Sequence, residues 1–227
     1  MTKIILLVIM NFKNHVFVFD LDDTLYKEID FAKSAYLFIA SKLERKLGKN
    51  IYQELLNGMQ LYQNPFSEIL LQYEGALDIN QLLNWYRFHE PSLILDLEVL
   101  QTLEYLFKNG TVLAVLTDGR AITQKNKLAA LNIGHFFSKI YISEEIGTEK
   151  PHENNYLMIQ NDFEAEQFVY IGDNFNKDFL TPNKFGWDTI GLLDNGQNIH
   201  KQNMNLPSAY LPKKTVKNLK EILSIYS

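Results

Sequence analysis

Residues 15–25 read HVFVFDLDDTL, and this stretch decides the fold of the chain. Residues 16–19 are all apolar and rich in β-formers, which is typical of a buried strand in a parallel sheet. The acidic residues begin where that strand should end. In open α/β sheets, ligands bind just beyond the carboxyl ends of the strands. The stretch therefore predicts a buried strand that delivers carboxylates to a ligand site.

The acidic residues of this stretch indicate a metal. Asp20 and Asp22 lie two positions apart, so in extended backbone both side chains would point the same way. Two such carboxylates repel each other unless a cation lies between them or one holds a proton. Mg²⁺ favours carboxylate and phosphate oxygens, so the pair indicates a Mg²⁺ site. The alternative is structural, since Asp23 and Thr24 could form a turn or cap a helix.

The composition narrows the class of protein. The chain has 227 residues, 46% of them hydrophobic, and a net charge of −5 at pH 7. This length fits a core domain with an inserted subdomain. The acidic balance argues against nucleic acid as the main partner, because phosphate backbones select basic surfaces. Cysteine is absent from the sequence, which excludes disulfides and a cysteine nucleophile and is compatible with the cytoplasmic location that we expect.

An apolar run precedes the first strand. Residues 4–10 are too few to span a bilayer, and no small-residue cleavage site follows them. We therefore expect no membrane partner. We also predict that translation begins at Met10, just before the strand.

After Thr24 the hydrophobic pattern changes to that of helices. Apolar residues recur three and four positions apart from residue 31 onward, and no strand signal interrupts residues 28–90. We therefore predict an all-helical insertion in this part of the chain.

Beyond residue 92 the chain alternates between strand and helix patterns. The predicted strands are residues 111–117, 139–142, 168–171 and 188–193. The predicted helices are residues 96–108, 121–131, 153–160, 177–185 and 215–226. Such alternation implies a parallel sheet with right-handed crossovers. The predicted fold class is therefore α/β, with a Rossmann-like parallel sheet that carries helices on both faces.

Polar groups also follow the later strands. Thr117 and Asp118 end the second strand, where a hydroxyl and backbone N–H groups can hold phosphate oxygens. Lys150 follows the third strand and precedes a proline suited to the first turn of a helix. The fourth strand ends at a glycine that lets the chain turn, which places Asp173 beside the first acids, with Asp178 about one helical turn later. Each group alone could be a turn, a solvated lysine or a helix cap, but four successive strand ends are far more specific.

In this order the motifs resemble those of the haloacid dehalogenase-like hydrolase superfamily. The matching segments are Asp20-x-Asp22-x-Thr24, Thr117, Lys150-Pro151 and Gly172-Asp173-(x)4-Asp178. The resemblance covers residues 15–193 and places the helical insertion where that superfamily has its C1-type cap. It implies a core domain at residues 10–26 and 92–227 and a helical cap domain at residues 27–91.

The resemblance also implies roles for the matched acids. Asp20 would attack phosphorus and form an aspartyl-phosphate. Asp22 would protonate the leaving oxygen and then activate water. Mg²⁺ would be held by the Asp20 carboxylate, the main-chain carbonyl of Asp22 and Asp173. Asp178 would act on this metal site from outside, through water.

The remaining matched residues would bind phosphate or brace the site. Thr117 and the amide of Asp118 would hold the transferring phosphoryl group, and Lys150 would offset charge between the phosphate and the nucleophile. Thr24 would brace the loop after the first strand. Family members often carry Asn where this chain has Asp118, so we expect that carboxylate to point away from the phosphate.

The second acid separates the reactions known in this superfamily. Dehalogenation needs no acid for a departing halide, so Asp22 favours phosphoryl transfer, and a small-molecule phosphomonoesterase is the leading hypothesis. A phosphomutase with the same core residues and a non-catalytic binding protein remain alternatives. The expected partner is a small phosphorylated metabolite, and no interface signature indicates an oligomeric state. Residues that could face the substrate are Tyr26, Lys27, Tyr36, Arg45, Tyr86, Arg87 and His89.

Overall fold

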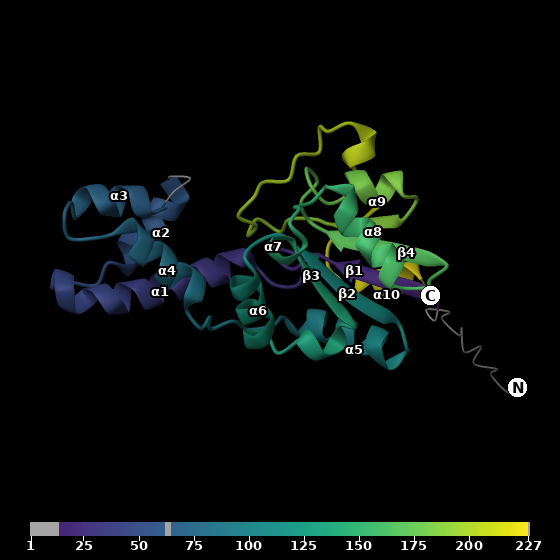
Figure 1. Ribbon diagram of the computed structural model, residues 1–227, viewed down its shortest axis with the longest axis horizontal. Coiled ribbons are helices and arrows are strands. Elements are labelled where there is room, and N and C mark those ends of the chain that lie inside the picture. The colour runs from purple at the N-terminus through teal and green to yellow at the C-terminus, as the bar shows by residue number, and fades with distance from the viewer. Residues whose placement is uncertain (1–13, 62–64, 227) are drawn as a thin grey trace, which may run out of the picture. The chain divides into compact units, whose positions relative to one another are not determined.

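The computed structural model describes residues 14–61 and 65–226 (Figure 1). The predicted start at Met10 and the apolar run before it lie outside the described residues. The chain divides into two compact units. Of the described residues, the sheet unit comprises 14–27, 95–121 and 133–226, and the helical unit comprises 28–61, 65–94 and 122–132. Among the described residues, no helix combines the length and the apolar character that a membrane span requires.

The sheet unit is built on six parallel strands in the order β3-β2-β1-β4-β5-β6. The strands are β1 (His15–Phe19), β2 (Val112–Thr117), β3 (Lys139–Ile142), β4 (Gln167–Gly172), β5 (Asp188–Leu192) and β6 (Lys214–Val216). The chain moves outward from β1 to β3 and then crosses to β4 on the other side of β1. A doubly wound sheet binds its ligands at such a reversal of strand order. The topology therefore points to the carboxyl ends of β1 and β4.

Both faces of this sheet are covered, as predicted for an α/β fold. On β1, Val16 and Val18 pack with Tyr156 in one buried cluster. Phe17, between them in sequence, points to the other face and packs against Tyr226 with ring centroids 5.2 Å apart. Figure 1 shows helices on both sides of the strands, with α8 on one side and α5 on the other. The helices of this unit are α5 (Leu97–Lys108), α7 (Ser143–Ile146), α8 (Glu153–Asp162), α9 (Leu180–Lys184) and α10 (Glu221–Ile225), with short 3₁₀ turns at Gly134–Phe136 and Ser208–Tyr210.

The helical unit contains the predicted insertion. Its helices are α1 (Glu28–Leu47), α2 (Tyr52–Leu61), α3 (Pro65–Gln72) and α4 (Ile79–Phe88), together with most of α6 (Ala121–Ala130). Acidic residues in the first turn of α1 and basic residues in its last turn match the helix dipole. The unit has its own apolar core, which includes Ala32, Tyr36, Ile39, Ala40, Leu43, Ile51, Leu55, Phe66, Ile69 and Leu82.

Residues 122–132 pack with the helices of the insertion. The Lys127 ammonium lies 4.6 Å from the centre of the Phe31 ring, and the Thr123 hydroxyl donates to the carbonyl of Arg87 at 3.2 Å. The sequence pattern marked this segment as a helix but contained no sign of these partners.

Three local predictions were wrong. Residues 215–226 do not form one helix, because residues 214–216 pair with β5 as an edge strand and only Glu221–Ile225 is helical. Of residues 177–185, only Leu180–Lys184 are helical, as helix α9, which follows a turn. Pro151 precedes α8 rather than lying in its first turn, and the peptide bond before it is cis. In each case tertiary pairing or loop geometry overrides a short local pattern.

Candidate active site

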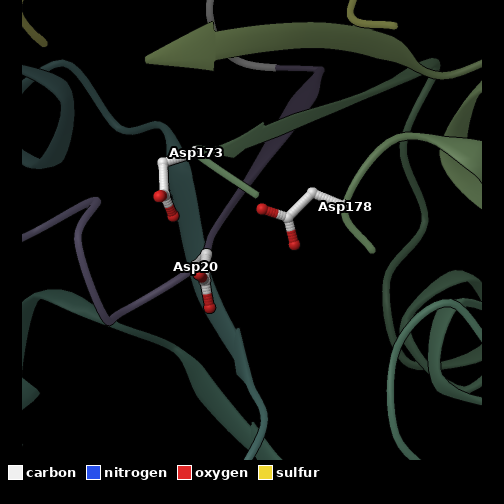
Figure 2. Close-up of side chains that lie close together, drawn as sticks. All are labelled: Asp20, Asp173 and Asp178. Atoms are coloured by element: carbon white, nitrogen blue, oxygen red, sulfur yellow. The ribbon is translucent and has the colours of Figure 1, made fainter. Parts of the chain in front are cut away.

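The strand ends bring the predicted acids together. Asp20 directly follows β1, and Asp173 directly follows β4, its hydrogen-bonded neighbour. The amide of Asp20 donates to the carbonyl of Ile171 at 2.8 Å, which extends the pairing to the first acid. Asp20, Asp173 and Asp178 are all buried, and one carboxylate oxygen from each lies within 4.8 Å of the others. Figure 2 shows these three side chains converging from separate segments of the chain.

Lys150 supplies the positive charge of this site. Its ammonium lies 2.8 Å from Asp20 Oδ1 and 2.8 Å from Asp178 Oδ1, and it donates to the Tyr170 hydroxyl at 3.2 Å. All three charged side chains are less than one-tenth exposed. Burial alone would lower the pKa of Lys150, but Asp178 and Asp20 outweigh that effect and hold the pKa well above its ordinary value. The ammonium is therefore a permanent cation beside the first acid.

Asp178 contacts Lys150 directly, a contact that the sequence did not indicate. Its Oδ1 also accepts from the Tyr170 hydroxyl at 3.2 Å, and its Oδ2 accepts from the amide of Asn174 at 2.8 Å. Both oxygens of Asp178 are thus engaged by donors of the protein. This carboxylate is suited to hold Lys150 and the turn after β4. It is a poorer candidate for a metal ligand than Asp173, whose Oδ1 has a donor at 3.4 Å, because each Asp178 oxygen has a donor at 2.8 Å.

Asp20 and Asp173, the other two acids of the cluster, lie in surroundings that favour the binding of a cation. For the protein chain alone, burial raises the pKa of Asp173 to about 9, and the nearby Asp178 and Asp20 charges add to this effect. Burial also raises the pKa of Asp20 to about 7, although Lys150 opposes the shift. Carboxylates in such surroundings take up either a proton or a cation. Oxygen ligands of this kind suit Mg²⁺, so Asp20 and Asp173 fit the predicted metal site.

Asp22 accepts a hydrogen bond from Tyr26, a residue that could face the substrate according to the sequence. The Tyr26 hydroxyl donates to Asp22 Oδ1 at 2.5 Å. Between them, Asp23 adopts left-handed backbone with φ 55°. Asp22 is partly exposed, whereas Asp20 is buried. The two acids therefore differ in solvation and in partners.

The side chain of Asp118 contacts Lys150 and Lys177. Its Oδ1 accepts from the amide of Lys150 at 3.0 Å, and its Oδ2 pairs with the Lys177 ammonium at 3.1 Å. Thr117 ends β2 and is fully buried. Both oxygens of the Asp118 carboxylate thus have donors from the protein.

Thr24 lies beside Asp173, the acid that follows β4. Its hydroxyl donates to Asp173 Oδ1 at 3.4 Å. The other oxygen, Asp173 Oδ2, accepts from the side-chain amide of Asn198 at 2.7 Å. The sequence did not predict three further residues of the site, which are Lys177, Tyr170 and Asn198. Tyr170 was hidden in an apolar strand pattern, and Asn198 in a polar segment that showed only loop character.

The aromatic candidates from the insertion pack within the helical unit. Tyr36 and Tyr86 lie edge-on to the Phe66 ring, with centroids 6.2 Å and 6.0 Å away. His89 is buried, and its ring nitrogens lie 2.9 Å from the Tyr86 carbonyl and 3.2 Å from the Ser34 hydroxyl. These side chains therefore serve the core of this unit.

Comparison with known proteins agrees with this geometry. The sequence profile of the haloacid dehalogenase-like hydrolase family matches residues 17–192. The glyceraldehyde 3-phosphate phosphatase of Methanopyrus kandleri is 31% identical over 191 residues, which are 77% of this chain and 82% of that protein. The phosphoglycolate phosphatase of Haemophilus influenzae is 32% identical over 111 residues, 48% of this chain and 46% of that protein.

A solved structure shares the fold. The HAD-hydrolase YfnB of Bacillus subtilis, crystallised with magnesium bound, superposes with a TM-score of 0.66 at 20% identity. The superposition covers 94% of this chain and 99% of that chain.

Proposed function

Because this chain belongs to the haloacid dehalogenase-like hydrolase family, we propose that it is a Mg²⁺-dependent phosphatase that forms an aspartyl-phosphate on Asp20. Curated relatives are phosphatases, and this chain is accordingly a phosphoryl hydrolase. The observation that carries the mechanism is that Asp20 and Asp173, at the ends of the neighbouring strands β1 and β4, lie close together and that the Lys150 ammonium contacts Asp20. An ammonium and a cation site around one buried carboxylate are what attack on a phosphate dianion requires.

The metal would be held by the carboxylates of Asp20 and Asp173 and the main-chain carbonyl of Asp22. Asp178 is left out of this set because its Oδ1 holds the Lys150 ammonium and its Oδ2 accepts from the amide of Asn174, both at 2.8 Å, whereas Asp173 Oδ1 has a contact from Thr24 at 3.4 Å. When bound, Mg²⁺ would neutralise charge that develops on the transferring phosphoryl group.

Lys150 prepares the nucleophile. Its ammonium lies 2.8 Å from Asp20 Oδ1, where it would orient the carboxylate and lower the repulsion between carboxylate and phosphate. An oxygen of Asp20 forms the new bond to phosphorus as the ester P–O bond breaks. The phosphoryl group would rest against the Thr117 hydroxyl and the amide of Asp118.

Asp22 acts as the acid in the first step and as the base in the second. As the ester bond breaks, its carboxyl group gives a proton to the leaving oxygen, so that an alcohol departs. The resulting carboxylate then takes a proton from the water that attacks the aspartyl-phosphate, which releases inorganic phosphate and restores both acids. The hydrogen bond from Tyr26 sets the orientation of Asp22 for both transfers.

The substrate class is a small phosphorylated metabolite. Relatives act on glyceraldehyde 3-phosphate and phosphoglycolate, which makes short phosphorylated acids and aldehydes the first compounds to test. We take residues 27–91 as a cap domain that selects among them and residues 10–26 and 92–227 as the catalytic core.

The test is phosphate release with Mg²⁺ from an aryl phosphate and from a panel of metabolites that includes both compounds. We expect hydrolysis that chelation abolishes and added Mg²⁺ restores. Asp20→Asn should lose it, whereas Asp30→Asn, an exposed carboxylate of α1, should not. Isomerised sugar phosphate without phosphate release would indicate a phosphomutase, and turnover unchanged in Asp20→Asn would overturn the mechanism.

A further inference from the structure

We infer that Asn198 is a positioning residue for Asp173 and that Lys27 fixes the orientation of its amide. The inference deepens the proposed function, because it assigns a residue to the metal site that the proposal places at Asp20 and Asp173. Asn198 lies in the segment after β5, outside every motif that the sequence analysis used. It touches a proposed metal ligand but none of the reacting atoms.

The side chain of Asn198 bridges a cation and a carboxylate. Its Nδ2 donates to Asp173 Oδ2 at 2.7 Å, and its Oδ1 accepts from the Lys27 ammonium at 2.6 Å. An ammonium only donates hydrogen bonds, and a carboxylate that holds a cation instead of a proton only accepts them. The amide therefore has one satisfactory orientation, because the flipped amide would set oxygen against oxygen and N–H against N–H.

The backbone around Asn198 is held from two sides. Asp194 Oδ1 accepts from the amides of Gly196, Gln197 and Asn198 at 2.8, 3.1 and 3.1 Å. The amide of Ile199 donates to Asp23 Oδ2 at 3.1 Å, which ties the segment to the loop after β1.

Gln202 closes the segment onto the same acid. Its Nε2 donates to the main-chain carbonyl of Asp173 at 2.8 Å and to that of Leu192 at 2.7 Å. Its Oε1 accepts from the amide of Asp194 at 3.0 Å. The segment 194–202 thus binds Asp173 twice. Gln202, at its end, contacts the main chain of Asp173, and Asn198, in its middle, contacts the carboxylate.

This arrangement is suited to orient a metal ligand. Asp173 Oδ2 is held by Asn198, and its Oδ1 has only the long contact from Thr24 at 3.4 Å. A neutral amide donor fixes the carboxylate without placing a positive charge next to a site for a cation. The Asn198 amide separates the charged Lys27 ammonium from Asp173, and the ammonium polarises this amide.

The direct test is the affinity for Mg²⁺ in the absence of substrate, measured by isothermal titration calorimetry. Asn198→Ala should weaken Mg²⁺ binding about 10-fold or more, which is the usual cost of losing a residue that orients a metal ligand. Gln197→Ala, an exposed neighbour in the same segment, is the matched control and should bind Mg²⁺ like the parent protein.

A double-mutant cycle tests the part played by Lys27. Lys27→Met should weaken Mg²⁺ binding when Asn198 is present and should not weaken it in Asn198→Ala, because Lys27 acts through the amide. Equal effects in both backgrounds would overturn this role.

The outcomes separate the two proposals. If the parent protein binds Mg²⁺, Asp173→Asn does not, and Asn198→Ala binds as the parent does, the inference fails while the proposed function stands. If the parent protein binds no Mg²⁺, both fail. Thermal unfolding of each variant without metal shows whether the fold is intact. If Asn198→Ala does not fold, the Mg²⁺ affinity of Lys27→Met tests the inference in its place.

Discussion

The ammonium of Lys150 lies 2.8 Å from Asp178 Oδ1, with both side chains almost completely buried. The same ammonium lies 2.8 Å from Asp20. A buried charge is costly unless it is paired and hydrogen-bonded. The Lys150–Asp178 pair therefore has two roles, since it places the cation at the proposed nucleophile and keeps both charges compatible with the fold.

Replacing Lys150 with Met should remove phosphatase activity and lower the free energy of unfolding by about 3–5 kcal/mol, because two buried carboxylates lose their partner. Chemical denaturation measures the stability. The double variant Lys150→Met/Asp178→Asn should recover part of that stability while it remains inactive. A stable, inactive Lys150→Met would show that the pair matters for chemistry alone.

Tyr26→Phe removes the hydroxyl that donates to Asp22 at 2.5 Å. Because Asp22 protonates the leaving oxygen in the proposed mechanism, we expect kcat for alkyl phosphates to fall about 10-fold, part of the roughly 10²–10⁴-fold that a positioned acid or base contributes. Aryl phosphates with weakly basic leaving groups should change little. Tyr210→Phe is the control, and an equal loss with both kinds of substrate would contradict this role.

Lys177→Met leaves the Asp118 carboxylate without its ion pair beside the proposed phosphate site. The pair is partly exposed, so we expect a rise in KM of about fivefold or less, as for an interaction worth up to about 1 kcal/mol. Steady-state kinetics at constant ionic strength measures this change. Adding Asp118→Asn to Lys177→Met should restore KM, and a double variant no better than the single one would refute the explanation.

His89 should make the fold sensitive to acid. Burial lowers the pKa of His89 below its ordinary value of 6.5, and the nearby Lys127 charge adds to this effect. As the pH falls through about 6.5, the unfolded chain takes up a proton that the folded chain does not, so stability falls. The free energy of unfolding, measured at about pH 7.5 and 5.5, should change less in His89→Asn than in the parent. An equal change in both would rule this contribution out.

The elements that carry the site were predictable because their signals are local. Apolar runs bounded by turn residues indicated β1 to β5, and acids or hydroxyls stood where the strands end. Parallel strands place such ends at one sheet edge, so the meeting of Asp20 and Asp173 followed from topology. The edge strand at residues 214–216 was missed because three residues contain too little pattern, and β5 beside them decides their conformation.

The sequence by itself determined the fold class, the helical insertion and the acids and lysine of the site, because periodicity and turn chemistry act over a few residues. Only the tertiary structure decided the partners of the charged groups. Lys150 meets Asp178 across 28 positions, Lys177 meets Asp118 across 59, and Asn198 meets Asp173 across 25. The physical reason is that a local pattern can require a buried charge to be paired, but only the packing of distant loops selects the side chain that pairs with it.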